Sequence, residues 1–170
     1  MRGSAILASL AFALTMSLLA EPTAAENCPE QQRRLAELEN VGRDLRQAIL
    51  RKDIDTLLAY LSNEREWQEL YAERKKALSD SSSSLYANLF DSELLNRRLR
   101  RSKKLMSAYE LLRRPETRIA VYARQDSRAE CWGWISYGSN RLSSADWRRL
   151  DLKHSQAGWK ITCLFGDACD

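Results

Sequence analysis

The sequence predicts an α+β domain in which helices come first and an antiparallel sheet follows. The chain has 170 residues, of which 44% are apolar and 29% charged, with three prolines and six glycines. This is the profile of a chain that folds around a core, and it excludes collagen, low-complexity and wholly disordered proteins. Apolar residues recur with a period of about 3.6 before Pro115 and of about 2 after it. Helices and strands that are separated in this way along a chain are typical of the α+β class.

The first 25 residues predict a secretory signal peptide. Arg2 is followed by the uncharged apolar run 5–20, and Thr23-Ala24-Ala25 places small residues where a signal peptidase cleaves. This run is shorter than the ~20 residues of a membrane-spanning helix, so an uncleaved anchor is disfavoured. A lipoprotein modified at Cys28 is also disfavoured, because Ala25-Glu26-Asn27 is not the small apolar sequence that such modification requires. We expect cleavage before Glu26 and one exported domain over residues 26–170, with no integral membrane segment.

The helical part is predicted to contain four helices. The first covers residues 30–51, the second begins after Asp53 as its N-cap, and the third follows Asn63. The serine run 81–84 predicts a turn or loop. A long fourth helix is expected from Asp91 or Ser92 to residue 113, where Pro115 ends it.

The second part predicts four strands joined by short connections. The expected strands are residues 118–124, 131–137, 147–154 and 159–165, all rich in Val, Ile, Tyr and Trp. Their connections, residues 125–130, 138–146 and 155–158, are too short for crossovers, so we expect an antiparallel meander.

Four cysteines, all in the expected mature chain, are typical of an oxidising compartment and predict two disulfide bonds. A zinc site is disfavoured, because the chain has no Cys-x-x-Cys pair. In a meander, Cys131 and Cys163 are separated by about 9–10 Å of sheet, which exceeds the ~7 Å limit for a disulfide. Cys131 is also expected near the 155–158 end of the sheet, whereas Cys169 follows the opposite end of the last strand, which disfavours Cys131–Cys169. Of the three possible pairings, we therefore expect Cys163–Cys169 together with Cys28–Cys131.

Two stretches of the chain resemble nuclear transport factor 2-like domains. Residues 48–61 (AILRKDIDTLLAYL) resemble the two helices with which those domains open, and residues 150–161 (LDLKHSQAGWKI) resemble their terminal hairpin. The resemblance covers roughly residues 40–165 and implies a cone, in which helices lie against the concave side of a curved sheet and often enclose a pocket. The family includes isomerases, dehydratases and cyclases with Asp–His or Asp–Tyr pairs, and also non-catalytic domains of the bacterial periplasm. The serine run and the cysteines depart from its usual pattern.

His154 is the only histidine and the first candidate for catalysis. It shares strand parity with Leu150 and Leu152, so we expect its side chain on the buried or pocket side of the sheet, where it could act as a general base. Its possible partners are Asp151, Tyr122 and Tyr137. A lone histidine at a strand end is more often an ordinary hydrogen-bonded residue, and Asp151 lies between Arg149 and Lys153 in an expected surface ion pair. We therefore assign no catalytic residue.

Two groups of residues are candidates for binding. Segment 96–104 (NRRLRRSKK) carries six basic residues, four of which would share one face of a helix and could meet an anionic lipid, a cell-wall polymer or an acidic protein. These four are Arg97, Arg100, Arg101 and Lys104. The simpler interpretation is a solvated helix face. Trp132 and Trp134 share one strand face, and we expect them in the core, with a pocket wall or a binding surface as the alternative.

The net charge of +4 is too small to indicate nucleic acid as a partner. We expect an exported, non-enzymatic binding or accessory module of the periplasm, which uses no cofactor or metal and binds an anionic ligand or an envelope protein. The alternatives are a small isomerase or lyase that uses His154, and an inhibitor or immunity protein that uses the basic helix.

Overall fold

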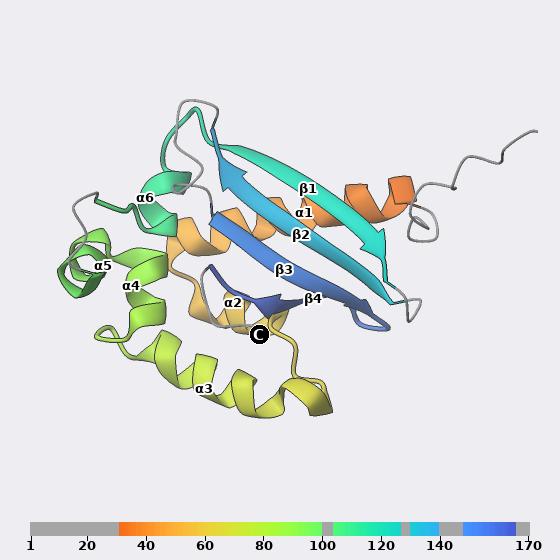
Figure 1. Ribbon diagram of the computed structural model, residues 1–170, viewed down its shortest axis with the longest axis horizontal. Coiled ribbons are helices and arrows are strands. Elements are labelled where there is room, and N and C mark those ends of the chain that lie inside the picture. Colours follow the sequence, from red (N-terminus) through yellow and green to blue (C-terminus); the bar gives the residue numbers. More distant parts are fainter. Residues whose placement is uncertain (1–30, 100–103, 127–129, 140–147, 166–170) are drawn as a thin grey trace, which may run out of the picture.

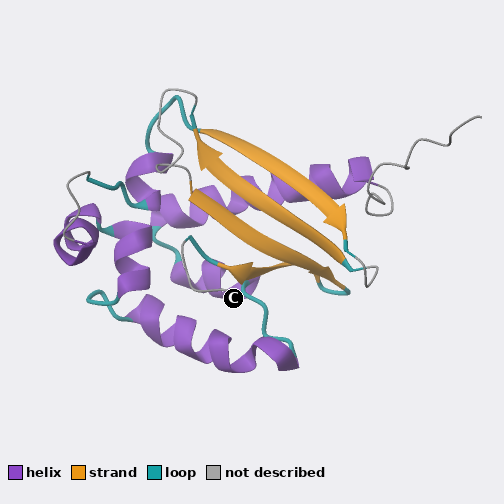
Figure 2. Ribbon diagram, viewed as in Figure 1, coloured by secondary structure: helices purple, strands orange, loops and turns teal. Residues whose placement is uncertain are grey.

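The structure is a computed structural model that describes residues 31–99, 104–126, 130–139 and 148–165. Over these residues it confirms the α+β class, because helices are followed by one four-stranded antiparallel sheet (Figures 1 and 2). None of the described helices is long and apolar enough to cross a membrane. The expected signal peptide, residues 1–25, lies outside the described residues.

The first three predicted helices are present. They are α1 (Gln31–Arg51), α2 (Ile54–Tyr60) and α3 (Gln68–Ser79), the last preceded by the 3-10 turn η1 (Arg65–Trp67). Asp53 caps α2 as expected, since its carboxylate accepts hydrogen bonds from the backbone N–H and the hydroxyl of Thr56 at 3.0 and 2.7 Å. Lys52 has a φ of 55°, so the chain turns from α1 into α2 through a left-handed residue.

The prediction of one long helix after Asp91 is wrong. Instead, α4 (Ser84–Phe90) begins directly at the serine run with Ser83 as its N-cap, α5 (Ser92–Leu99) follows, and α6 (Ala108–Leu112) is separate. Asn96 holds the chain out of the helical path, because its amide bonds both the N–H and the carbonyl of Leu105 at 2.7 Å. Ser107 then starts α6 as a new N-cap. Hydrogen bonds from two polar side chains thus override a continuous apolar stripe.

The sheet confirms the predicted meander. Its strands are β1 (Arg118–Gln125), β2 (Cys131–Gly138), β3 (Arg148–Ser155) and β4 (Gly158–Cys163), in the order β1-β2-β3-β4. Trp147, predicted as a strand residue, lies outside the described residues. In the last hairpin His154 faces Trp159 and Cys163 faces Asp151, and the register shifts between Asp151 and Leu152.

One face of the sheet, here called the inner face, packs on α1, which crosses behind the strands in Figure 1. Two glycines allow this close approach. A Cβ at Gly133 would lie 2.7 Å from Leu38 and 3.0 Å from the Trp159 ring, and one at Gly42 would lie 3.0 Å from Ile119. Across the same contact, the hydroxyl of Tyr137 donates to the carbonyl of Gly42 at 2.9 Å. The buried hydrophobic residues of the sheet all belong to this core.

The outer edge of β4 is covered by the chain that follows α2. Leu61 pairs with Ile161 in a parallel bridge, and the N–H of Ser62 donates to the carbonyl of Ile161 at 2.9 Å. The buried guanidinium of Arg74 donates to the carbonyl of Thr162 at 2.7 Å. These contacts protect an edge that would otherwise offer free carbonyl groups to another chain.

The cysteine pairing can be tested by peptide mapping. Cys131 and Cys163 lie on β2 and β4 with β3 between them, which places them too far apart to bond to each other. No described cysteine is a free thiol. Cys28 and Cys169 lie outside the described residues, so the pairs Cys28–Cys131 and Cys163–Cys169 stay a prediction. Non-reducing tryptic maps should contain a peptide that joins Cys28 to Cys131; a peptide that joins Cys131 to Cys169 would contradict it.

Candidate functional site

The face of the sheet opposite α1, here called the outer face, gathers aromatic and basic side chains. Strand alternation and register place them in two cross-strand rows. Tyr122, Trp134 and Asp151 form one row, and Arg124, Trp132 and Lys153 form the next. Arg149 projects from β3 beside them. Figure 1 views this face directly, and no described helix crosses in front of β1, β2 and β3.

Trp134 is the centre of the outer face. Its indole stacks on the Tyr122 ring, with centroids 4.3 Å apart and planes inclined by 21°. The guanidinium carbons of Arg149 and Arg124 lie 4.8 and 5.8 Å from the Trp134 ring. These are distances at which a cation is attracted to an aromatic face. Tyr122 is the one large hydrophobic residue that is exposed in the described part of the chain, at 45%.

Trp132 is held in a separate polar network. Its indole N–H donates to Asp126 at 3.1 Å, and the Lys153 ammonium lies 5.7 Å from its ring. The ammonium of Lys153 also pairs with Glu130 at 2.9 Å and Glu66 at 3.0 Å. The hydrogen bond to Glu130 raises the pKa of Lys153 above its ordinary value, with a smaller contribution from Glu66. Lys153 is therefore already neutralised by the protein.

Between these rings lies a hollow of about 230 Å³. Trp67, from η1, adds a third tryptophan, and the indole N–H of this residue is occupied by Glu66 at 2.9 Å. Arg149 is paired with Asp151 at 2.5 Å, whereas Arg124 forms no ion pair among the described residues. The hollow thus contains two guanidiniums and one carboxylate. Its full lining is Trp67, Arg124, Trp132, Gly133, Trp134, Arg149, Asp151, Thr162 and Cys163.

The structure corrects the expected place of the two strand tryptophans. Trp132 and Trp134 are half-buried on the outer face, and it is their neighbours Gly133 and Ile135 that meet α1. The reason is steric, since α1 approaches the sheet too closely at Gly133 to leave room for an indole. Sequence reasoning missed Trp67, Arg124 and Arg149 as members of the site. Tyr122 and Arg124 are two residues apart, which indicates that they share one face of their strand. The sequence does not, however, predict the register that aligns them with Trp134 and Trp132.

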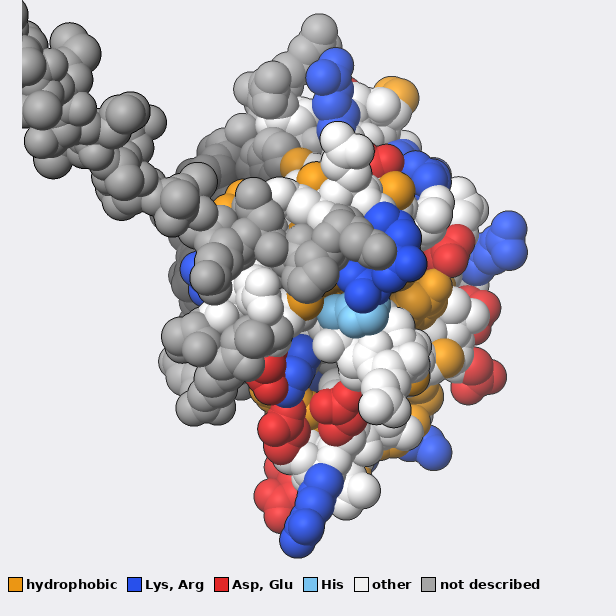
Figure 3. All heavy atoms as spheres, turned by 90° about the vertical axis from the view of Figure 1, so that its right-hand side faces the viewer, with side chains coloured by type: hydrophobic (Ala, Val, Ile, Leu, Met, Phe, Trp, Pro, Cys, Tyr) orange, Lys and Arg blue, Asp and Glu red, His pale blue; other side chains and the backbone are white. Residues whose placement is uncertain are grey.

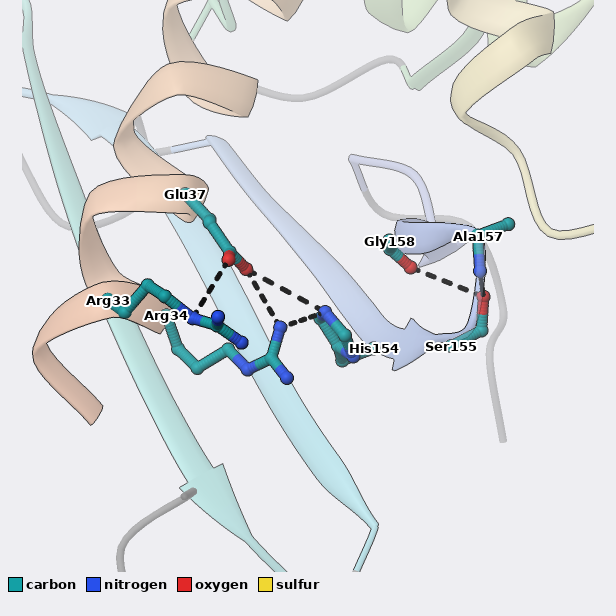
Figure 4. A network of polar contacts seen from close by, with 7 residues as sticks. All are labelled: Arg33, Arg34, Glu37, His154, Ser155, Ala157 and Gly158. Carbon is teal, nitrogen blue, oxygen red and sulfur yellow. Dashed lines mark hydrogen bonds and ion pairs between the residues drawn. The ribbon is translucent and has the colours of Figure 1, made fainter. Parts of the chain in front are cut away.

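His154 lies away from this site, at the end of β3 where the turn 155–158 begins (Figure 4). The guanidinium of Arg34, on α1, contacts the imidazole Nε2, and Glu37 lies 3.0 Å from the same guanidinium and 3.7 Å from Nε2. The Trp159 ring packs edge-on against the imidazole, with centroids 5.0 Å apart. Figure 3 shows the histidine side chain (pale blue) at the surface of this end of the molecule, beside a basic side chain.

The protonation of this cluster follows from its contacts. Burial lowers the pKa of His154, and the charge of Arg34 lowers it further, while Glu37 acts in the opposite direction. Burial alone would raise the pKa of Glu37, but the hydrogen bond and charge of Arg34 outweigh it and lower this pKa. In the neutral form of the imidazole, Nε2 can accept from the Arg34 guanidinium when the ring proton is on Nδ1.

We predict that His154 makes the protein less stable in mild acid. Because its pKa is lower in the folded state, protons bind preferentially to the unfolded chain, and stability falls as the pH drops below the ordinary histidine pKa of 6.5. Since the chain has one histidine, His154→Gln should flatten the dependence of urea midpoint on pH between about 7.5 and 5.5. An equal slope in both proteins would contradict this assignment.

The structure does not bring the catalytic candidates together. His154 contacts Arg34 and Glu37, whereas Asp151 and Tyr122 lie on the outer face. Tyr137 is fully buried against α1, and burial raises its pKa well above the ordinary tyrosine value. The described residues contain no group of three or more His, Cys, Asp or Glu side chains that could hold a metal ion.

The prediction that segment 96–104 forms a basic helix face is also wrong, as far as the residues of this segment are described. The helix α5 ends at Leu99, and Lys104 lies beyond it in non-helical chain, while Arg100 and Arg101 lie outside the described residues. Arg97 is exposed and 3.9 Å from Glu93. Arg97 and Lys104 do border one hollow, but Glu93 and Glu110 share it. The outer face of the sheet is therefore the better candidate for binding.

In comparisons with known proteins, no family model, no curated protein and no solved structure matches this chain. The function therefore has to be argued from the outer face itself.

Proposed function

We propose that this protein is an exported, non-enzymatic binding module of the periplasm, and that its outer face binds an anionic component of the cell envelope. The observation that carries the proposal is the combination on one open face of three tryptophans, Tyr122 and the guanidinium of Arg124, which forms no ion pair with the part of the chain that the structure describes. Rigid aromatic rings next to arginine are the groups that most often dominate the energy of binding sites.

Two features support binding over catalysis. The aromatic and basic side chains of the outer face are groups that recognise ligands through ring stacking and charge-assisted hydrogen bonds. His154, the only histidine of the chain, contacts Arg34 through its Nε2 atom and does not border the tryptophan-lined hollow. A base whose acceptor nitrogen is already occupied is poorly placed to take a proton from a substrate.

Likeness to the nuclear transport factor 2-like domains is part of this proposal. What supports it is the order of elements, with helices before an antiparallel meander, and the turn that leads into Gly158-Trp159 of β4. In the cone of that family the ligand pocket lies on the concave, helix-covered side of the sheet. Here α1 fits closely against the inner face at Gly42 and Gly133, which favours the outer face as the binding surface.

Export is proposed from the sequence of residues 1–25. Protein recovered from the periplasm should begin at Glu26, because Ala25 and Thr23 are the small residues that a signal peptidase accepts. N-terminal sequencing checks this. Retention of Met1 in a membrane pellet would contradict it.

Binding can be tested by co-sedimentation with insoluble cell-wall sacculi from a Gram-negative bacterium. The mature protein should pellet with sacculi, and more weakly as salt increases, because exposed charges are screened beyond about 8–10 Å at physiological ionic strength. Arg124→Glu should weaken binding about tenfold, a difference of about 1.4 kcal/mol. Trp134→Ala should weaken binding at least as much.

Arg97→Glu is the matched control. It makes the same change of charge at an exposed arginine, but on α5 and away from the outer face. His154→Gln is the control for the enzyme alternative. Both should bind as the unchanged protein does. Equal losses of binding for Arg124→Glu and Arg97→Glu would show that the protein is attracted by net charge alone. A protein that never pellets with sacculi would contradict the proposed binding to the cell envelope.

A further inference from the structure

We infer that the tryptophan-lined hollow of the outer face is a subsite for one pyranose sugar ring that carries an acidic group, either a carboxylate or a phosphate. This inference rests on the proposed function and names the chemistry of its ligand. It follows from the size of the hollow, the kinds of groups that line it and the balance of their charges.

The size of the hollow fits a single ring. Its volume, about 230 Å³, is below the roughly 300–1,000 Å³ of pockets that enclose drug-sized ligands. It opens on a sheet face that no described helix covers, so the remainder of a longer chain can continue over the surface. The hollow therefore suits one unit of a polymer or one monosaccharide.

The lining fits a molecule with both apolar and polar edges. Trp67, Trp132 and Trp134 line the hollow, and indole rings are groups that can pack against the C–H face of a sugar. Asp151 and Arg149 lie among these rings and can hydrogen-bond to the hydroxyl groups at its rim. A purely apolar ligand would desolvate this ion pair without replacing its bonds to water, which is unfavourable.

The charge balance favours an acidic group on the sugar. Asp151 neutralises Arg149, while Lys153 is held by Glu66 and Glu130. This leaves the exposed guanidinium of Arg124 without a carboxylate partner among the described residues. The same guanidinium lies 5.8 Å from the Trp134 ring. A guanidinium next to a stacking ring can bind a carboxylate or a phosphate through two parallel hydrogen bonds. Arg124 is thus the residue that selects an acidic sugar over a neutral one.

The test uses small probes and the indole N–H signals of the tryptophans in NMR spectra. Glucuronate and glucose 6-phosphate carry the two possible acids, glucose is the neutral sugar, and benzoate is an aromatic acid without a sugar ring. At least one acidic sugar should shift the signals of Trp67, Trp132 and Trp134 and bind at least tenfold more tightly than glucose and benzoate. The buried Trp159 of the inner face should not respond. Whichever acidic sugar binds more tightly identifies the carboxylate or the phosphate as the natural group.

Variants separate the roles of ring and charge. Arg124→Gln should remove the preference for the acidic sugar and leave the weak binding of glucose, whereas Arg97→Gln should change neither. Trp134→Leu should weaken both sugars. Benzoate binding as tight as glucuronate binding, or unchanged indole signals with every sugar, would overturn the inference. Continued pelleting with sacculi in either case would leave the proposed envelope binding standing, so the two failures are distinguishable.

Discussion

Tyr137→Ala should cost about 3–5 kcal/mol of folding free energy, which is the range for truncating a large buried aromatic residue. The side chain is fully buried, with 0% exposure, between the inner face and α1. It packs on Phe165, with ring centroids 6.0 Å apart, and donates to the carbonyl of Gly42 at 2.9 Å. Urea unfolding followed by circular dichroism measures the loss.

Tyr137→Phe is the control for the hydrogen bond alone. It keeps the ring and removes only the hydrogen bond from the tyrosine hydroxyl to the carbonyl of Gly42, so we expect a loss of about 0.5–1.5 kcal/mol. This variant should bind the proposed ligand normally, since Tyr137 lies on the inner face. A stable Tyr137→Phe protein that has lost its biological activity would instead favour the isomerase or lyase alternative.

Gly133→Val should cost about 1–3 kcal/mol or more, because it overfills the contact between the sheet and α1. Its Cβ would lie 2.7 Å from the Leu38 side chain and 3.0 Å from the Trp159 ring, and the two additional methyl groups have no space. The matched control is Ala120→Val, which adds a β-branched side chain at an exposed position of the same sheet. That variant should remain within about 0.5 kcal/mol of the unchanged protein. Equal unfolding midpoints for both variants would show that α1 does not approach β2 so closely.

Local patterns in the sequence predicted the elements that depend on short-range chemistry. The period of α1, the Asp53 cap of α2 and the alternation of β1–β4 were all readable, because hydrophobic periodicity and capping involve residues a few positions apart. The antiparallel meander followed from short connections. The short turn between β3 and β4 also sets the register next to it, in which His154 pairs with Trp159.

The tertiary structure decided what depends on residues far apart in the chain. Asn96 interrupts the expected long helix by bonding the backbone that follows α5, and Ser107 starts α6 as its N-cap. The period of the apolar residues does not indicate either interruption. The contact of α1 with Gly133 decides which strand face is inner, and therefore turns Trp132 and Trp134 outward. The chain by itself determined its α+β class and its helix and strand order through local periodicity. Only three-dimensional packing, in which one face of the sheet has to accommodate α1, decided that the aromatic and basic residues of β1, β2 and β3 share one open surface with Trp67.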